Sequence, residues 1–324
     1  MRDEMIVVFG GSGFIGRYVV RALARAGKRV RVAMRRPHLG HELRVMGDVG
    51  QIQLVQANVR DAASVARPLE GASGAVNLVG LLFEKGRQTF KDVQAAGAAA
   101  IAQACAAAGV ERLVHVSAIG ADAGSKSAYG RTKAAAEAAM RAAVPGAVIL
   151  RPSIVFGPED DFFNRFAQMA RMSPALPLIG GGKTLFQPVY VGDVADAVVA
   201  GLDRADARGK TFELGGPQTY SFKDLLSYIT ATIDRPRLLV GLPFPVAQTM
   251  GRLADVVFRF NPFAGPPLTG DQVEMLKTDN VVSPGALTLA DLGVGPLETV
   301  EAITPAYLYR FRPYGQFQTR QKPV

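Results

Sequence analysis

The sequence has no tryptophan, a single cysteine and three histidines. One cysteine, Cys105, cannot form a disulfide or a thiolate metal site within one chain, which suits a reducing compartment. Cys105 stands in an alanine-rich stretch, where we expect a small core residue. Because His115 also falls inside a predicted strand, we expect no bound metal.

Long apolar runs and leader signals are also missing. No uninterrupted apolar run reaches about 18 residues, so we expect no membrane-spanning helix. The first predicted strand begins at about residue 5, so we expect no signal or transit peptide ahead of it. The expected location is cytoplasmic, with peripheral attachment to the inner face of a bacterial inner membrane as the alternative.

Acidic residues are outnumbered, 28 against 37 Lys and Arg, which leaves a formal net charge of +9. Such a charge favours an anionic partner. An anionic membrane surface, an acidic protein or a phosphorylated cofactor would each satisfy it, and coding bias towards Ala and Arg is the other explanation. No nucleic-acid recognition motif occurs, so we expect no nucleic acid as a partner.

The residues that are abundant fit a globular α/β protein. The chain has 324 residues, of which 48% are hydrophobic, enough for one large domain and a smaller one. Met5 to Phe9 reads as a buried strand, and Arg17 to Ala26 has apolar residues at helical spacing. A glycine turn between strand and helix is typical of dinucleotide binding, because bare backbone can approach a pyrophosphate there. The predicted contacts are Gly10, Gly11, Ser12, Gly13, Phe14, Ile15 and Gly16.

The end of the second predicted strand indicates which dinucleotide is bound. NAD-binding folds place an acidic residue there to hold the ribose 2′-hydroxyl. Here Arg35 and Arg36 follow the strand, and no Asp or Glu occurs between Gly16 and Glu42. A guanidinium binds a phosphate in bidentate fashion. The pattern therefore predicts NADP(H), although two arginines at a strand end can also be merely solvated.

Further predicted strands cover 51–56, 75–79, 113–117 and 147–151. Strands that alternate with helices at this spacing predict a Rossmann-type, doubly wound parallel sheet. The side-chain carbonyl of Asn58 can meet the exocyclic amine of adenine. The strand ends are expected to complete the cofactor pocket with Asn58, Val59, Val79, Gly80 and Pro152.

A candidate reaction centre follows the fifth strand. Tyr129 and Lys133 are four residues apart and lie on one face of a predicted helix. An ammonium beside a phenol lowers the phenol pKa, so Tyr129 can act as general acid or base while Lys133 holds the nicotinamide ribose. With Ser117 at the strand end, these are the candidate catalytic residues.

These motifs resemble those of the extended or atypical short-chain dehydrogenases/reductases. The resemblance runs through most of residues 5 to 235. Within that superfamily the chain is most similar to the NADPH-bearing accessory subunits of respiratory complex I and their bacterial relatives. The shared motifs are Gly10 to Gly16, Asn58 to Asp61, Tyr129 to Lys133, Leu150 to Pro158, Pro188 to Ala195, Arg35-Arg36, Val116 to Ala121 and the tail from Tyr307 to Phe317.

Two positions depart from the extended family. A catalytic hydroxyl usually follows the serine that ends the fifth strand, but this position is Ala118. The family aspartate near adenine is replaced by Asn58. Without that hydroxyl, a stabilising interaction worth on the order of 10²-fold in rate is missing. The resemblance therefore implies a tightly held, structural NADPH.

Two functions remain open from the sequence. One is an accessory or assembly component of respiratory complex I, with bound NADPH and little or no turnover. The other is an active NADP-dependent oxidoreductase or epimerase/dehydratase on a small alcohol, a sterol-like compound or a nucleotide sugar. Tyr129 and Lys133 favour the second, whereas Ala118 and the tail favour the first.

We expect residues 1–151 to form the cofactor-binding domain and 152–308 a smaller α/β lid that binds substrate or a partner. Gly192 to Arg204 is expected to return to the main sheet as a helix. Within 243–267, apolar residues recur every three or four positions, so a helix either packs on the lid or rests on a membrane or partner. The basic and aromatic tail, 309–324, either frays or docks on an acidic or lipid surface.

Overall fold

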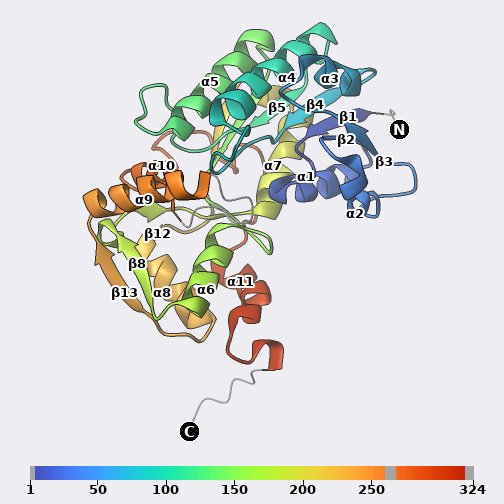
Figure 1. The fold of residues 1–324 in the computed structure, drawn as a ribbon. Coiled ribbons are helices and arrows are strands. Elements are labelled where there is room, and N and C mark those ends of the chain that lie inside the picture. The colour runs from blue at the N-terminus through green and yellow to red at the C-terminus, as the bar shows by residue number, and fades with distance from the viewer. Residues whose placement is uncertain (1–3, 260–267, 318–324) are drawn as a thin grey trace.

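A computed structural model describes residues 4–259 and 268–317. The chain forms two lobes, with the large sheet and its helices in one and shorter strands and helices in the other (Figure 1). Within the described residues, seven parallel strands form the main sheet. They are β1 (Met5–Phe9), β2 (Arg29–Met34), β3 (Ile52–Gln56), β4 (Gly74–Asn77), β5 (Leu113–Val116), β6 (Val148–Pro152) and β11 (Thr211–Leu214).

The strand order is β11-β6-β5-β4-β1-β2-β3, which is the doubly wound order that the sequence predicts. β2 and β3 follow on one side of β1, and β4, β5, β6 and β11 follow in order on the other side. Because all seven strands are parallel, their carboxyl ends meet at one edge of the sheet. The helices that cover its two faces are α1 (Phe14–Arg25), α2 (His41–Arg44), α3 (Ala62–Ala66), α4 (Ala96–Ala107), α5 (Ala128–Ala143) and α7 (Val191–Asp203).

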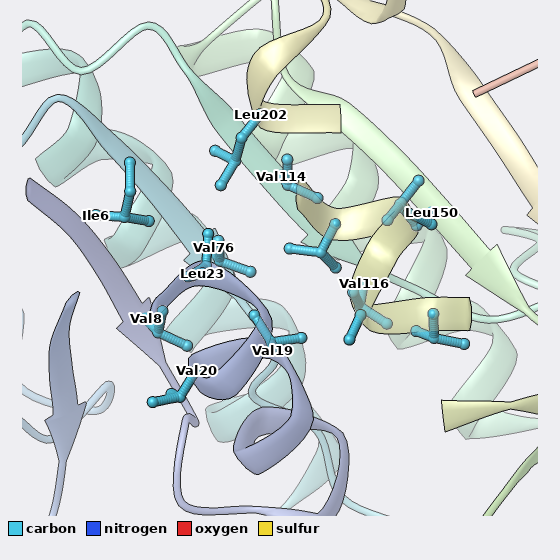
Figure 2. Close-up of a cluster of buried hydrophobic side chains, with 14 of the residues drawn as sticks. Ile6, Val8, Val19, Val20, Leu23, Val76, Val114, Val116, Leu150 and Leu202 are labelled. Atoms are coloured by element: carbon cyan, nitrogen blue, oxygen red, sulfur yellow. The ribbon is translucent and has the colours of Figure 1, made fainter. Parts of the chain in front are cut away.

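One face of the sheet packs against α1 and α7 through branched aliphatic side chains (Figure 2). Val19, Val20 and Leu23 of α1 are fully buried against the strands, and Leu202 of α7 lies in the same cluster. The expected helix over 192–204 therefore does return to the main sheet. The other face packs against α3, α4 and α5, where Cys105 is a buried core residue as predicted.

The second lobe, here called the small lobe, has its own apolar core built around phenylalanines such as Phe163 and Phe222. Its helices are α6 (Phe162–Met172), α8 (Phe222–Thr232), α9 (Phe244–Arg259), α10 (Gly270–Met275), α11 (Val300–Ile303) and α12 (Pro305–Leu308). Its strand pairs are β7 (Val155–Phe156) with β10 (Val189–Tyr190), β9 (Leu185–Phe186) with β12 (Tyr220–Ser221), and β8 (Ala175–Ile179) with β13 (Leu238–Leu242).

Most predicted strands match the structure within one residue, and the differences have local causes. β4 ends at Asn77 rather than Val79, because the Asn77 side-chain carbonyl accepts the Val79 N–H at 3.0 Å and turns the chain. The residues Phe90–Ala95 form a π-helical turn that runs directly into α4. The edge strand β11 pairs with β6, although the sequence analysis placed no strand there.

A buried carboxylate, Asp160, lies between β7 and α6 and joins two helices of the small lobe, α6 and α12. Asp160 is 3% exposed and accepts the Phe163 N–H at 2.6 Å, at the start of α6. The Tyr307 hydroxyl, in α12, donates to the same carboxylate at 2.6 Å. Burial raises the pKa of Asp160 to about 6.

Relative to an Asp160→Asn variant, we expect the wild-type protein to gain stability as the pH falls from about 6 to 4. The folded-state pKa of about 6 exceeds the unfolded value of 3.8, so only the folded chain holds the proton in that range. The gain is at most about 1.4 kcal/mol per pH unit and is lost as the pH rises through 6. Urea unfolding of both proteins at several pH values measures it, and identical pH profiles would contradict it.

Candidate functional site

The glycine loop lies at the carboxyl edge of the main sheet, where the strand order reverses. β1 stands between β2 and β4. The connections run outward from this point in opposite directions, so the chain that leaves β1 enters the crevice between the two halves of the sheet. Gly10 has φ +83°, a backbone conformation that side-chain-bearing residues rarely adopt. A Cβ on Gly16 would lie 2.3 Å from the Gly10 carbonyl oxygen. The fold itself therefore requires both glycines.

Gly11 is also required by packing, since its Cβ would lie 2.8 Å from Cγ1 of Val32. Gly13 is different. It is the exposed N-cap of α1, has φ −78°, and its Cβ would meet only the Gly10 carbonyl oxygen at 3.4 Å. Nothing within the described chain demands glycine there, and the missing side chain leaves the backbone open to a ligand.

The first turn of α1 is prepared for an anion. Among the described residues, no side chain caps the N-terminus of α1, and its first turn contains no acidic residue. Free N–H groups and the helix dipole together favour a phosphate at such a terminus. The remaining loop residues support this geometry: the Phe14 ring packs over Gly157, Ile15 borders the core, and the Ser12 carbonyl accepts from Arg17 Nε at 3.4 Å. The loop thus fits the pyrophosphate of a dinucleotide.

Arg35 and Arg36 follow β2 at the same edge of the sheet, and both are exposed. Glu42, the first acidic residue after the loop, forms an ion pair with Arg17, with Arg17 Nη2 3.0 Å from Glu42 Oε1. Glu42 is therefore engaged by a neighbouring cation. The end of β2 presents positive rather than negative charge to a ligand.

The other predicted cofactor residues also stand at carboxyl strand ends. The Asn58 side-chain carbonyl accepts the Arg60 N–H at 3.2 Å, so it stabilises its own turn after β3. Val59 packs where a Cβ on Gly97 would fall. Val79 and Gly80 follow β4, and the position of a Cβ on Gly80 would be 3.5 Å from Lys133 Nζ. Pro152 ends β6, where its carbonyl accepts the Ile119 N–H at 3.0 Å.

Tyr129 and Lys133 lie in the first two turns of α5, as the sequence predicts. Lys133 is 5% exposed, and its ammonium nitrogen lies 5.6 Å from the centre of the Tyr129 ring. The ammonium donates to the Val116 carbonyl at 3.2 Å. The structure therefore brings the ends of β4 and β5 together with this pair.

The expected effect of Lys133 on the phenol is wrong for this structure. Burial, followed by the charge of Asp271, raises the pKa of Tyr129 to about 12. Burial also lowers the pKa of Lys133 to about 8. The Lys133 ammonium donates to the Val116 carbonyl. The Asp271 carboxylate, which the sequence analysis did not identify, adds to the rise in the phenol pKa. Both burial and Asp271 therefore oppose ionisation of the Tyr129 phenol.

Ser117 directly follows β5 and is buried, and its hydroxyl has no hydrogen-bond partner within the described part of the chain. The next residue, Ala118, presents a methyl group at the position of the missing hydroxyl. Behind this point His115 is 1% exposed, contacts Asn77 at 3.1 Å, and has its pKa lowered to about 3 by burial. The site thus has a buried hydroxyl without a partner, that of Ser117, next to the apolar side chain of Ala118.

Sequence reasoning missed two residues that organise α5. Gln94 accepts the Leu81 N–H at 2.9 Å and donates to the Thr132 hydroxyl at 3.1 Å, tying the loop after β4 to this helix. Asp271, from the small lobe, accepts the Ala128 N–H at 2.7 Å. A Thr-x-x-Gln capping box at Thr269 marks the start of α10, but no local signal connects Asp271 to a helix more than a hundred residues away.

A cavity of about 220 Å³ adjoins Tyr129 between α5, α9 and the loop before Phe90. The Phe90 ring, which lines it, stacks edge-on against Tyr129 at 5.9 Å. Its charged lining is mainly acidic, with one lysine, Lys85. The carboxylates and aromatic rings of the lining are Glu84, Asp255, Asp271, Phe83, Phe90 and Phe258.

The predicted amphipathic helix is α9, and its apolar stripe faces outward. Val246, Met250, Leu253 and Val257 are 47 to 67% exposed. The helix packs instead through its small residues; Ala247 is fully buried. Residues 260–267, the rest of the predicted segment, lie outside the described residues. No helix in the described parts of the chain has the length and apolar character needed to cross a bilayer.

The predicted tail divides into two parts. Phe311 is 7% exposed, and its carbonyl accepts from Arg235 Nε at 2.8 Å. Arg312 donates to the Thr232 carbonyl at 3.1 Å. The start of the tail is therefore attached to the small lobe, whereas Tyr314 and Phe317 are exposed aromatics. Residues 318–324 are outside the described residues.

The sequence pattern of the NAD dependent epimerase/dehydratase family matches residues 6–215. The chain is 39% identical over 311 residues to the mitochondrial NADH dehydrogenase (ubiquinone) 1 alpha subcomplex subunit 9 of Mus musculus, covering 94% of this chain and 81% of that protein. It is 38% identical over 299 residues to the protein of the same name from Arabidopsis thaliana, covering 89% and 73%.

Among solved structures, the fold is similar to MoeE5 in complex with UDP-glucuronic acid and NAD. The TM-score is 0.68 with 20% identical residues, over 93% of this chain and 96% of that one. At this identity the similarity shows the fold alone. It is an NAD(P)-binding fold, in agreement with the geometry of the glycine loop.

Proposed function

The chain belongs to the NAD dependent epimerase/dehydratase family, and we propose that it is an NADP(H)-binding accessory subunit of respiratory complex I with little or no turnover. One contrast carries the proposal. The groups that hold a dinucleotide are intact around Gly13, whereas the groups that act on a substrate are incomplete at Ala118 and Tyr129. Such a site retains a cofactor better than it uses one.

The charge at the end of β2 supports NADP(H) in preference to NAD(H). Arg35 and Arg36 can bind a 2′-phosphate in bidentate fashion, and Glu42 is engaged by Arg17. The α1 N-terminus would hold the pyrophosphate, and Tyr129 with Lys133 would hold the nicotinamide ribose. When bound, the cofactor would supply hydride-transfer chemistry.

Weak turnover follows from two features of the reaction centre. Ala118 cannot donate a hydrogen bond to a substrate oxygen, a contribution of on the order of 10²-fold or more in rate. General acid–base catalysis is efficient when the pKa lies near the working pH. Tyr129, with its pKa raised to about 12, is a poor base under those conditions.

The named relatives support the proposal that the chain is a subunit of complex I. Two mitochondrial proteins named as 1 alpha subcomplex subunit 9 are 38 and 39% identical to this chain over about nine-tenths of its length. We propose the same type of assembly for this chain. Its formal net charge of +9 suits an acidic partner subunit or an anionic membrane.

We further propose that the outward stripe of α9 rests on an anionic membrane surface. Val246, Met250, Leu253 and Val257 repeat at the spacing of one helix face and are all exposed. An exposed apolar helix face combined with basic residues is typical of interfacial binding. The basic tail would add electrostatic attraction. This arrangement would place the protein peripherally at the inner face of a bacterial inner membrane.

A second candidate is an active NADP-dependent oxidoreductase or epimerase/dehydratase. The observation in its favour is that Tyr129 and Lys133 are retained on one face of α5. The cavity beside them disfavours nucleotide sugars, because three carboxylates against one lysine repel a diphosphate. A neutral alcohol or a sterol-like substrate would suit the phenylalanines that line it.

Three versions of the chain test the proposal in the native host: wild type, Tyr129→Phe and Leu253→Glu. We expect the wild type to migrate with a membrane complex and to carry NADPH. Tyr129→Phe should also do both, because it removes one ribose contact and leaves the proposed pyrophosphate and 2′-phosphate contacts in place. Leu253→Glu should keep NADPH but release the protein from the membrane, since a charge within the exposed apolar stripe opposes interfacial binding. Native electrophoresis with nucleotide analysis measures both properties.

Met172→Glu is the matched control, because Met172 is another exposed apolar residue, outside α9. Steady turnover of an alcohol/ketone pair that disappears in Tyr129→Phe would reverse the ranking of the two candidates. Wild-type protein without dinucleotide, or absent from any membrane complex, would overturn the proposal.

A further inference from the structure

Asp271 holds the amino end of the helix that carries Tyr129. Its carboxylate accepts three hydrogen bonds: from the Ala128 N–H at 2.7 Å, the Ser127 hydroxyl at 2.8 Å and the Tyr129 N–H at 3.2 Å. Ser127 is itself the N-cap of α5 and accepts the Gly130 N–H. The first turn of α5 is therefore capped twice, once by its own serine and once by a residue from α10.

The second cap comes from a segment that is itself firmly positioned. A capping box at Thr269 begins α10, and Asp255 of α9 accepts the Gly270 N–H at 2.9 Å. Gln248 donates to the Gly270 carbonyl at 3.0 Å. A Cβ on Gly251 would lie 2.7 Å from the Gly270 nitrogen, so the backbones of α9 and α10 are in close contact. Figure 1 shows these two helices at the border between the lobes.

A carboxylate at this position cancels a feature that would favour the phenolate. The positive end of a helix dipole stabilises negative charge in the first turn, where Tyr129 lies. Asp271 occupies that positive end with its own negative charge. The charged or titratable groups on the elements packed around Tyr129 are Lys133 on α5, His115 on β5, Lys126 before α5, Glu84 and Lys85 in the loop before Phe90, Asp255 on α9 and Asp271 on α10.

These groups do not balance in favour of ionisation. Lys133 donates to the Val116 carbonyl, and His115 is buried and neutral, with its pKa lowered to about 3. Of the nearby carboxylates, Asp271 is the one whose charge adds to burial in raising the pKa of Tyr129. Asp255 lies on α9, where it accepts the Gly270 N–H, and makes no hydrogen bond to α5 in the described structure.

We propose that Asp271 is a positioning residue whose carboxylate, fixed at the amino end of α5, opposes formation of the Tyr129 phenolate, the base form that oxidation of an alcohol would need. The functional meaning of this role rests on the proposed function, in which the site holds a cofactor. The effect of Asp271 on Tyr129 concerns the protein alone and can be measured without cofactor. A segment of the small lobe thereby disfavours the base form of a tyrosine in the large one.

Ultraviolet titration of tyrosinate in the full-length, cofactor-free protein tests the proposal, with the Tyr129→Phe spectrum subtracted in each background. In wild type, Tyr129 should ionise well above 10. In Asp271→Asn, which retains an acceptor for the Ala128 N–H, its pKa should fall by about one unit or more. Asp255→Asn is the matched control and should leave Tyr129 unchanged. Ser127→Ala loosens the cap without removing charge and should also leave it unchanged.

Three results would overturn the proposal. They are a wild-type Tyr129 that ionises at or below 10, an Asp271→Asn variant without a shift, or a Ser127→Ala variant that shifts as far as Asp271→Asn. The first needs no variant of Asp271, so the test survives if that variant does not fold. Binding of NADPH, followed separately by its fluorescence, distinguishes failure of the cofactor proposal from failure of this one.

Discussion

A Gly13→Ser variant is expected to lose NADPH affinity by at least about tenfold while remaining as stable as wild type. Serine is a preferred N-cap, and Gly13 already has the extended backbone of that position. Its hydroxyl can accept an N–H from the first turn of α1. The new side chain would thus occupy the anion site that glycine leaves open, at no cost to the helix.

Gly16→Ala is the informative comparison. Its Cβ would fall 2.3 Å from the Gly10 carbonyl oxygen and 2.6 Å from the Gly11 Cα, so this variant should lose both stability and binding. Fluorescence titration with NADPH and thermal unfolding separate the two outcomes. If Gly13→Ser bound NADPH as wild type does, the loop would not be the pyrophosphate site.

The second large effect is expected for Arg35→Asp. Charge-assisted hydrogen bonds contribute about 1.5–3 kcal/mol, and here one would be replaced by repulsion. NADPH affinity should therefore fall roughly 10- to 100-fold. Affinity for NADH, which lacks the 2′-phosphate, should hold or rise. The ratio of the two dissociation constants is the measurement, because it cancels any general damage to the loop.

Arg67→Asp provides the control for charge alone, because Arg67 is an exposed residue of the 3₁₀ turn Arg67–Leu69 after α3. It should change neither dissociation constant by more than about twofold. An unchanged preference in Arg35→Asp and in the Arg35→Asp/Arg36→Asp double variant would refute the assignment of the 2′-phosphate to these guanidiniums.

The sequence predicted those parts of the site that are local in the chain. The glycine loop joins a strand directly to a helix, so its spacing defines its geometry. Tyr129 and Lys133 are one helical turn apart, and their common face follows from helix periodicity alone. The doubly wound parallel class of the sheet also followed, because parallel connections between adjacent strands have few allowed arrangements.

The features that the sequence did not predict depend on distant segments. Burial and the charge of Asp271 together raise the pKa of Tyr129, and Asp271 reaches α5 only through the packing of α9 and α10. The strand β11 is four residues long and follows a helix, so its pairing with β6 has little local signal. The apolar stripe of α9 had the right period, but whether it faced the core depended on the close approach of Gly251 to Gly270.

The return of the chain to the main sheet has a consequence for biosynthesis. The core beside α1 is completed by α7, by β11 and finally by Leu289 and Leu292, all of which follow the first segments of the small lobe. On the ribosome, the emerging nucleotide-binding half must therefore wait with one face uncovered until nearly the whole polypeptide has been made. Cutting the gene at residue 151 would leave six of the seven main-sheet strands without the helix and strand that cover and extend them, an aggregation hazard, and nascent chains are expected to need chaperone protection until translation ends.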